Sequence, residues 1–262
     1  MNILVCVKQV PDDYAQIHLD PATGLPATAG ADKVANAFDT YALELAARYC
    51  ETHGGEVTVA CIGPESAVSM MKNLLAVGAK KAYLFSDEGL QDSDEAAVAS
   101  YLVSVVKKCE ELNGEAFGMV LCGKESTDEI SSQVGARLAE KLNAGFVSSV
   151  IEVEPNGDQL VAKQETEDGY IKFSVSSPAV FTIAKPAYDP RYPNIKAKMA
   201  ARKAVIPVVS AADAGIEKVA NLASCIGYSE PAKRSAGVKI QEKEAADAVS
   251  KAMNFLLQDK VL

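Results

Sequence analysis

Short apolar runs and amphipathic stretches alternate along the first half of the chain. The apolar runs are rich in β-branched residues and predict buried strands at NILVCVK (2–8), EVTVACI (56–62), AYLF (82–85) and FGMVLC (117–122). Helical periodicity fills the segments between them, at about 38–53, 65–77 and 93–113. This alternation predicts an α/β fold, a doubly wound and mainly parallel Rossmann-like sheet covered on both faces. Ligands of such a sheet bind beyond the carboxyl ends of its strands.

The pattern changes from about residue 146. Alternating apolar and polar positions, broken by turn residues, predict antiparallel strands added to the sheet as far as residue 184. A proline-rich connector, KPAYDPRYPNIK, precedes a helix-forming run, KAKMAARK (196–203), and an amphipathic helix is expected at 242–259. We therefore expect an α/β domain at 1–184 and a C-terminal arm at 185–262. The arm has too little regular structure for its own core and is expected to pack on a partner subunit.

The charge balance excludes one class of partner. The 262 residues carry a formal net charge of −9, so there is no basic surface to neutralise nucleic-acid phosphates. The one basic run, KAKMAARK, is either a solvated helix face or a docking site for an acidic partner. No run approaches the roughly 20 apolar residues of a membrane span, and no secretory signal core is present. We expect no membrane insertion.

Cysteine and histidine usage argues against metal and hydrolytic sites. The six cysteines have no C-x-x-C spacing and the chain has two histidines, so no metal site is expected. Cys6, Cys61 and Cys122 lie in or at the end of apolar runs and are expected to be buried. No disulfide framework is indicated, which favours a reducing, cytoplasmic setting. Nothing resembles a G-x-S-x-G nucleophile elbow, and no catalytic residue is assigned.

The polar loop GKESTDEISSQVG (123–135) follows the fourth predicted strand. A helix beginning near 129–132, with an apolar stripe of Ile130, Val134, Leu138 and Leu142, would direct its free N–H groups beyond the strand end. Such a helix start suits an anion. The alternative is a simple capped helix, with Ser126 and Glu129 as a capping box. Gln133 lies off the stripe, where it can either reach a ligand or face solvent.

Five segments together resemble the β subunit of electron-transfer flavoproteins. They are VCVKQVPD (5–12), NAFDTYALE (36–44), the GKESTDEISSQVG loop, PRYPNIKAK (190–198) and EPAKRSAGVK (230–239). The resemblance implies a heterodimer with an α subunit that carries FAD, and an adenine nucleotide, FAD or AMP, buried in the α/β domain. It also implies electron transfer between NADH or another donor and an acyl-CoA dehydrogenase. The chain would be an electron carrier, either as a separate carrier protein or as part of an NADH-dependent acyl-CoA reductase or dehydrogenase complex.

The resemblance also carries over a nucleotide site, position by position. The strand-end and helix-start part of this site is Cys6, Val7, Lys8, Asn36, Ala37, Phe38, Asp39 and Ile62. The loop part, expected to hold phosphates, is Gly123, Lys124, Glu125, Ser126, Thr127, Asp128, Ser131, Ser132, Gln133 and Val134. Lys124 could add positive charge or face solvent.

Two departures from the family pattern bear on function. In the stretch DEISSQVG, the hydroxyl of Ser131 and the Val134-Gly135 pair match relatives that bind a second FAD, whereas Glu129 and Ile130 match neither the FAD nor the AMP type. PRYPNI lacks three residues, ending in a leucine, that some relatives use to anchor the dehydrogenase. We therefore expect FAD in the site and a dedicated complex with one dehydrogenase. The alternative is a non-redox adenine-nucleotide-binding module of the stress-protein type, which flavin absorption would exclude.

Overall fold

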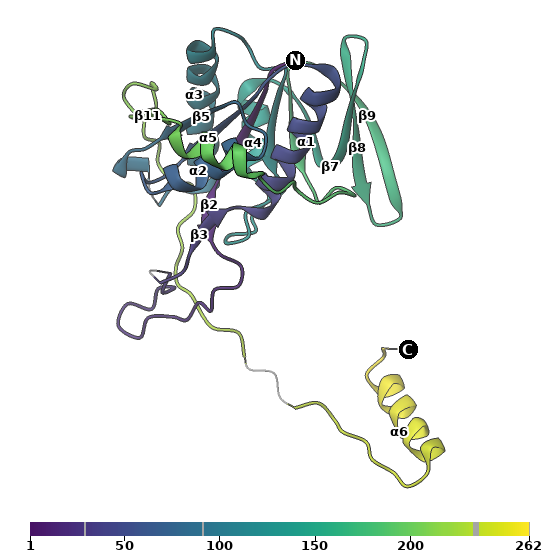
Figure 1. Ribbon diagram of the computed structural model, residues 1–262. Coiled ribbons are helices and arrows are strands. Elements are labelled where there is room, and N and C mark those ends of the chain that lie inside the picture. Colours follow the sequence, from purple (N-terminus) through teal and green to yellow (C-terminus); the bar gives the residue numbers. More distant parts are fainter. Residues whose placement is uncertain (29, 91, 233–235, 262) are drawn as a thin grey trace. The chain divides into compact units, whose positions relative to one another are not determined.

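The chain forms two compact units in a computed structural model that describes residues 1–28, 30–90, 92–232 and 236–261 (Figure 1). The first unit is Met1–Gly227 and the second is Tyr228–Leu262. The first unit contains the expected α/β domain and continues through 185–227. Packing of the C-terminal arm on another subunit stays a prediction.

A nine-stranded sheet is the centre of the first unit, in the order β11-β5-β4-β1-β6-β10-β7-β8-β9. The parallel strands are β1 (Ile3–Val7), β4 (Val57–Ile62), β5 (Lys81–Phe85), β6 (Met119–Gly123), β10 (Ala179–Ile183) and β11 (Val208–Val209), and β7 (Gly145–Asn156) pairs in parallel with β10. The antiparallel strands β8 (Gln159–Thr166) and β9 (Gly169–Ser176) extend the sheet beyond β7. The predicted α/β fold and its four N-terminal strands are confirmed.

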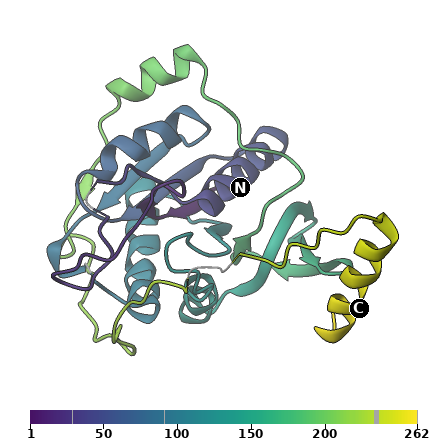
Figure 2. The ribbon, with the colours of Figure 1, turned by 90° about the horizontal axis from the view of Figure 1, so that it is seen from below.

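Helices cover both faces of this sheet. They are α1 (Ala37–His53), α2 (Ala67–Ala76), α3 (Glu95–Asn113) and α4 (Val134–Leu142). Figure 2 shows α1 and α2 on one side of the sheet and α3 and α4 on the other. Side chains alternate along each strand, so every central strand supplies both cores. Burial on both faces explains the continuous apolar runs of the sequence.

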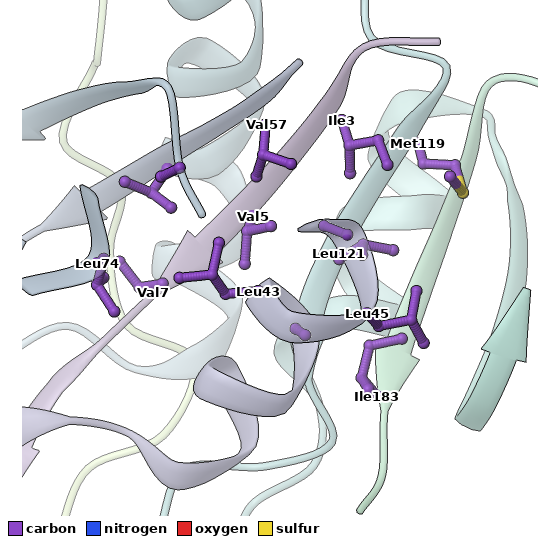
Figure 3. Close-up of a cluster of buried hydrophobic side chains, with 14 of the residues drawn as sticks. Ile3, Val5, Val7, Leu43, Leu45, Val57, Leu74, Met119, Leu121 and Ile183 are labelled. Carbon is purple, nitrogen blue, oxygen red and sulfur yellow. The ribbon is translucent and has the colours of Figure 1, made fainter. Parts of the chain in front are cut away.

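The two cores have separate residues. Ile3 and Val5 of β1 pack with Leu121 of β6 beneath Leu43 of α1 (Figure 3). On the opposite face, Leu4 lies in the cluster that contains Tyr101, Val120 and Leu138, all buried. Cys6, Cys61 and Cys122 are buried in these cores, as predicted.

Three features of the sheet differ from the sequence prediction. The segment AVFTIA was expected to be antiparallel, but β10 is parallel and lies between β6 and β7. All five of its residues are buried, which is the property of an interior parallel strand. The short strand β11 at the edge was not predicted. Neither was the separate antiparallel pair of β2 (Gln9–Pro11) with β3 (Lys33–Ala35).

The remaining helices follow the connector. The helix α5 (Ile195–Lys203) packs on α2 (Figure 1), and Asn194 caps it by accepting a hydrogen bond from the Ala197 N–H at 2.8 Å. In the second unit, α6 (Ala245–Gln258) has no buried residue among those described. Its apolar side chains, Val249, Met253, Phe255 and Leu257 among them, are exposed. Within the described ranges, no helix combines the length and apolar character that a bilayer crossing requires.

Candidate functional site

A cavity of 360 Å³ opens at the carboxyl ends of β1, β4 and β6. After β1 the chain crosses to β4 on one side, and β6 returns to the other side, so this is the point at which the strand order reverses. Open α/β sheets bind ligands at such a switch point. The predicted site residues that line the cavity are Cys6, Val7, Lys8, Asn36, Asp39, Ile62, Gly123, Lys124, Glu125, Ser126, Ser131, Ser132, Gln133 and Val134. The volume is within the range of roughly 300–1,000 Å³ typical of small-molecule sites.

The first turn of α1 holds the strand ends in place. The carboxylate of Asp39 accepts hydrogen bonds from the N–H of Lys8 at 2.7 Å and from the N–H of Gly123 at 2.9 Å. Asn36 accepts from the N–H of Thr127 at 3.1 Å, and its Nδ2 donates to the carbonyl of Glu125 at 2.8 Å. The NAFD segment therefore fixes the end of β1, the end of β6 and the start of the polar loop.

Burial dominates the electrostatics of Asp39. The residue is 5% exposed, and removal from water raises the pKa of its carboxyl from the ordinary value of 3.8 to about 7. The hydrogen bonds from Lys8, Asn36 and Gly123 favour the charged form and limit this rise. A charge change near neutral pH is thus built into the centre of the site.

Lys8 carries the positive charge at the end of β1. Its Nζ lies 2.9 Å from Asp128 Oδ1 and 2.9 Å from Glu129 Oε2. Burial alone would lower the pKa of Lys8, but the hydrogen bonds to these two carboxylates outweigh burial and raise it. The capping box of Ser126 and Glu129, which was the alternative for this loop, is not formed, because Glu129 pairs with Lys8 and α4 begins at Val134.

The loop before α4 is longer than predicted. We expected the helix to begin near 129–132, but α4 begins at Val134. Ile130 and Ser132 have φ angles of 54° and 56°, which a helix cannot accommodate. Ile130 is therefore not part of the apolar stripe, and its side chain is 65% exposed. The stripe continues as predicted with Leu138, which is fully buried.

The start of α4 presents donors to the cavity. The first turn of a helix has N–H groups without intrahelical partners and a partial positive charge. Around it, Ser132 donates to Glu125 Oε2 at 2.7 Å, and Gln133 Oε1 accepts from Arg137 at 2.8 Å and 3.1 Å. Gln133 thus lies at the helix start, held by the next turn, with its side chain on the cavity wall.

Helix packing explains why position 135 is a glycine, which the sequence alone did not show. A Cβ atom at Gly135 would lie 2.2 Å from Cγ2 of Thr182 on β10, so the packing of α4 on the sheet requires glycine there. Close helix–sheet contact brings the α4 N-terminus to the strand ends.

Part of the cavity lining was not predicted from the sequence. It includes Gly63 and Pro64 after β4, apolar Leu90 of the 3₁₀ turn Glu88–Leu90, and Val98 and Leu102 of α3. Carboxylates also lie here, namely Asp87, Asp92 and Glu95, and the remaining lining residues are Ser93, Cys122, Glu129 and Gly135. The segment 86–94 follows β5, so inspection of the loop after the third predicted strand could have found it.

Four predicted site residues do not line the cavity. Ala37 and Phe38 lie in the first turn of α1, and Asp128 pairs with Lys8. Thr127 lies in the loop, and its Oγ1 is buried without a hydrogen-bond partner in the described part of the chain. Backbone or hydroxyl contacts from these residues to a nucleotide stay a prediction.

A larger cleft of 810 Å³ lies elsewhere, between α1, α2 and the segment 189–193. None of the predicted nucleotide-site residues lines it. It lacks the convergence of strand ends with a helix N-terminus, so the smaller cavity is the better candidate for an anionic nucleotide.

Comparison with known proteins identifies the family of this chain. Residues 24–214 match the family model of the electron transfer flavoprotein domain. The electron transfer flavoprotein subunit beta of Megasphaera elsdenii is 33% identical over 271 aligned positions, which cover 100% of both chains. The corresponding subunit of Thermoanaerobacterium thermosaccharolyticum is 36% identical over 219 positions, covering 83% of this chain and 82% of that one. The caffeyl-CoA reductase-Etf complex subunit CarD of Acetobacterium woodii is 33% identical over 217 positions, covering 82% and 80%.

These similarities, together with the α/β fold, define the class of protein as an α/β electron-transfer protein. The chain belongs to the electron transfer flavoprotein family and is a member of the β-subunit type, with a role in electron transfer. The resemblance predicted from its five sequence segments is confirmed.

Proposed function

We propose that the chain is an electron-transfer β subunit that holds FAD in the cavity beyond β1 and β6. The observation that carries this proposal is the convergence of Lys8, the polar loop and the α4 N-terminus on one cavity of 360 Å³. When bound, FAD supplies the redox chemistry through its isoalloxazine ring. The chain's own residues bind and orient the nucleotide.

The cavity has different walls for different parts of an adenine nucleotide. The apolar side chains of Ile62, Leu90, Val98 and Leu102 suit a base ring. Carboxylates such as Asp87 can accept hydrogen bonds from ribose hydroxyls. Phosphates fit the opposite end, where the first turn of α4 and the hydroxyls of the loop provide donors. The buried hydroxyl of Thr127 is a further donor in this loop.

The choice of FAD over AMP rests on the loop. Ser131 and Ser132 line the cavity beside the helix start, and a diphosphate carries more charge for these donors to stabilise than a monophosphate. The hydroxyl at Ser131 and the Val134-Gly135 pair also resemble FAD-binding relatives. The family description names flavoproteins. AMP is the alternative, and nucleotide extraction separates the two.

The partner in this proposal is an electron-transfer flavoprotein α subunit that carries its own FAD. The exposed apolar side chains of α6, including Met253 and Phe255, need a covering surface. Residues 185–227 pack within the first unit, so we propose that the second unit, Tyr228–Leu262, packs on the α subunit through α6. The chain is accordingly purified with a co-expressed α subunit in the experiments below.

The proposed electron route runs between NADH and an acyl-CoA dehydrogenase. One relative is named as a subunit of a caffeyl-CoA reductase-Etf complex, which supports a complex of this kind for the present chain. The short PRYPNI turn favours a dedicated complex with one dehydrogenase over transient docking to several. We place this assembly in the cytoplasm.

Alanine at both Ser132 and Gln133 is expected to release the β nucleotide while the α flavin stays bound. Each lost hydrogen bond to a charged phosphate is worth roughly 1.5–3 kcal/mol, so release should be at least about tenfold faster per bond. The matched control is Ser174→Ala with Gln159→Ala, a hydrogen-bonded serine–glutamine pair on the β8–β9 hairpin. Nucleotides retained after gel filtration are measured by mass analysis. Equal retention by both double variants would contradict the proposed phosphate site.

NADH is expected to bleach flavin absorbance in the purified heterodimer under anaerobic conditions. A hydride transfers two electrons to a flavin, so reduction by one equivalent of NADH is measured at the flavin bands. The Ser132→Ala, Gln133→Ala double variant serves as control, because it should keep the α flavin and lose the β nucleotide. Reduction that is unchanged in this variant would show that the β nucleotide does not receive the hydride. It would leave the binding proposal standing.

A further inference from the structure

Asp39 joins two adjacent strands at the point where the sheet opens. It lies in the first turn of α1, and each of its two carboxylate oxygens accepts one backbone hydrogen bond. One donor is the N–H of Lys8 just after β1, at 2.7 Å, and the other is the N–H of Gly123 at the end of β6, at 2.9 Å. Since β1 and β6 are neighbours in the sheet, this carboxylate spans the base of the crevice.

Gly123 packs closely against Asp39 and the first turn of α1. A Cβ atom at Gly123 would lie 2.4 Å from Asp39 Oδ1 and 2.7 Å from Phe38 Cβ. The backbone of β6 therefore contacts the first turn of α1 directly. Asn36, which is 1% exposed, fastens the following loop through Glu125 and Thr127.

The charge of Asp39 is balanced mainly by backbone N–H groups. The titratable groups that face it are Lys8 and Cys6 from β1 and its end, and Cys61 from β4. The ammonium of Lys8 is engaged by Asp128 and Glu129, each at 2.9 Å. Burial raises the pKa of the Cys61 thiol to about 12, and the pKa of Cys6 is also raised, so both are neutral near pH 7.

We propose that Asp39 is a positioning residue whose ionised carboxylate holds the ends of β1 and β6 at the separation that the nucleotide phosphates require. This inference rests on the proposed nucleotide site. It gives Asp39 an indirect role in nucleotide binding, because Asp39 acts through the positions of the two strand ends. A carboxylate accepts at both oxygens, whereas a protonated carboxyl group loses one acceptor position to its own proton. Protonation would release one strand end and loosen the phosphate loop.

Nucleotide affinity and folding stability should depend on the charge of Asp39 in opposite directions. Burial raises the pKa of Asp39 to about 7, so the ionised form predominates above that pH. Nucleotide affinity should therefore fall on acidification through pH 7. A raised folded-state pKa contributes stability that is present below the unfolded value of 3.8 and is lost as pH rises through about 7. Protonation of Asp39 does not unfold the chain, so the nucleotide is released on acidification from a folded protein.

The test compares wild type with Asp39→Asn in the co-expressed heterodimer. FAD and AMP are titrated separately into nucleotide-stripped protein from about pH 8.5 to about pH 5.5, and folding is followed by circular dichroism. Wild type should bind at least about tenfold more weakly at the acidic end, with a midpoint near 7, because one hydrogen bond to a charged group is lost. Asp39→Asn should bind weakly throughout, with no midpoint near 7. The phosphate of AMP itself titrates near pH 6, and the pH profile of Asp39→Asn measures this contribution separately.

The matched control is Asp20→Asn, because Asp20 also accepts two backbone N–H groups, at 2.7 Å and 3.2 Å, but lies in an exposed loop. This variant should keep the wild-type profile. If Asp39 mainly repels the phosphates, Asp39→Asn would bind more tightly than wild type, and the positioning role would be wrong. Should Asp39→Asn fail to fold, a flat wild-type profile would still overturn the inference. Failure of wild type to bind either nucleotide at any pH would instead overturn the proposed function.

Discussion

Replacing Gly123 with alanine is expected to empty the β site of nucleotide and to destabilise the fold. The new methyl group would lie 2.4 Å from Asp39 Oδ1, 2.7 Å from Phe38 Cβ and 3.0 Å from Asn36 Nδ2, so the first turn of α1 must move. Such overpacking costs about 1–3 kcal/mol. The same movement breaks the hydrogen bond from Gly123 to Asp39 and displaces the loop that Asn36 holds. We expect nucleotide affinity to fall by about 10- to 100-fold.

Gly63→Ala is the matched control for this substitution. Gly63 also follows a central strand and lines the same cavity, but a Cβ there would meet its nearest neighbour, Cys61 Sγ, at 3.5 Å, an ordinary contact. This variant should keep its nucleotide, and its free energy of unfolding should lie within about 0.5 kcal/mol of the wild-type value. Chemical denaturation and nucleotide extraction measure the two effects. Normal loading of Gly123→Ala would show that the α1 contact does not shape the site.

Removing the side chain of Arg191 should destabilise the first unit by about 3 kcal/mol. Glu44 is buried, and Arg191 binds its carboxylate through Nε at 2.8 Å and through the backbone N–H at 3.1 Å. Arg191 also binds Glu51, at 3.0 Å through Nη2. Breaking a buried ion pair costs about 3–5 kcal/mol, and the lower end applies because Arg48 still binds Glu44 at 2.6 Å. The segment 189–193, which precedes α5, would lose its side-chain bonds to α1 and keep the backbone bond to Glu44.

The destabilisation by Arg191→Ala should shrink in acid. Burial alone would raise the pKa of Glu44, but the hydrogen bonds from Arg191 and Arg48 outweigh it and lower that pKa. A depressed carboxyl pKa contributes stability above the unfolded value of 4.5 that is lost as pH falls through the folded value. Urea unfolding at pH 7 and near pH 4 tests this. Lys163→Ala, which breaks an exposed ion pair to Glu152 at 3.3 Å, is the control and should cost no more than about 1 kcal/mol. An equal loss in both variants would contradict the role of buried Glu44.

The regular part of the fold was predictable because burial on both faces gives parallel strands their continuous apolar runs. The first four strands and the helices between them followed from such runs and from the helical periodicity of the segments between the runs. The strand β10 was assigned to an antiparallel set, although its five residues are all buried. Chain order alone does not show that this strand returns between β6 and β7. That position depends on long-range pairing.

The site was predictable where it follows strand ends and less so where it depends on loop geometry. The switch-point rule and the family resemblance placed Lys8, Asn36 and Gln133 at one cavity. The left-handed conformations of Ile130 and Ser132 delay the start of α4, and no sequence pattern used to place the helix indicates them. The bridge from Asp39 to both strand ends joins residues 31 and 84 positions apart, which no local pattern reveals.

In the proposed function, the β cavity binds an adenine nucleotide in addition to the flavin of the α subunit. The decisive measurement is acid extraction of the purified wild-type heterodimer, followed by mass analysis and quantitation. We expect two molecules of FAD per heterodimer, one of them lost in Gly123→Ala. One flavin together with one AMP would overturn the FAD assignment and retain the site. One flavin with no second adenine nucleotide would show that the β cavity is not a nucleotide site.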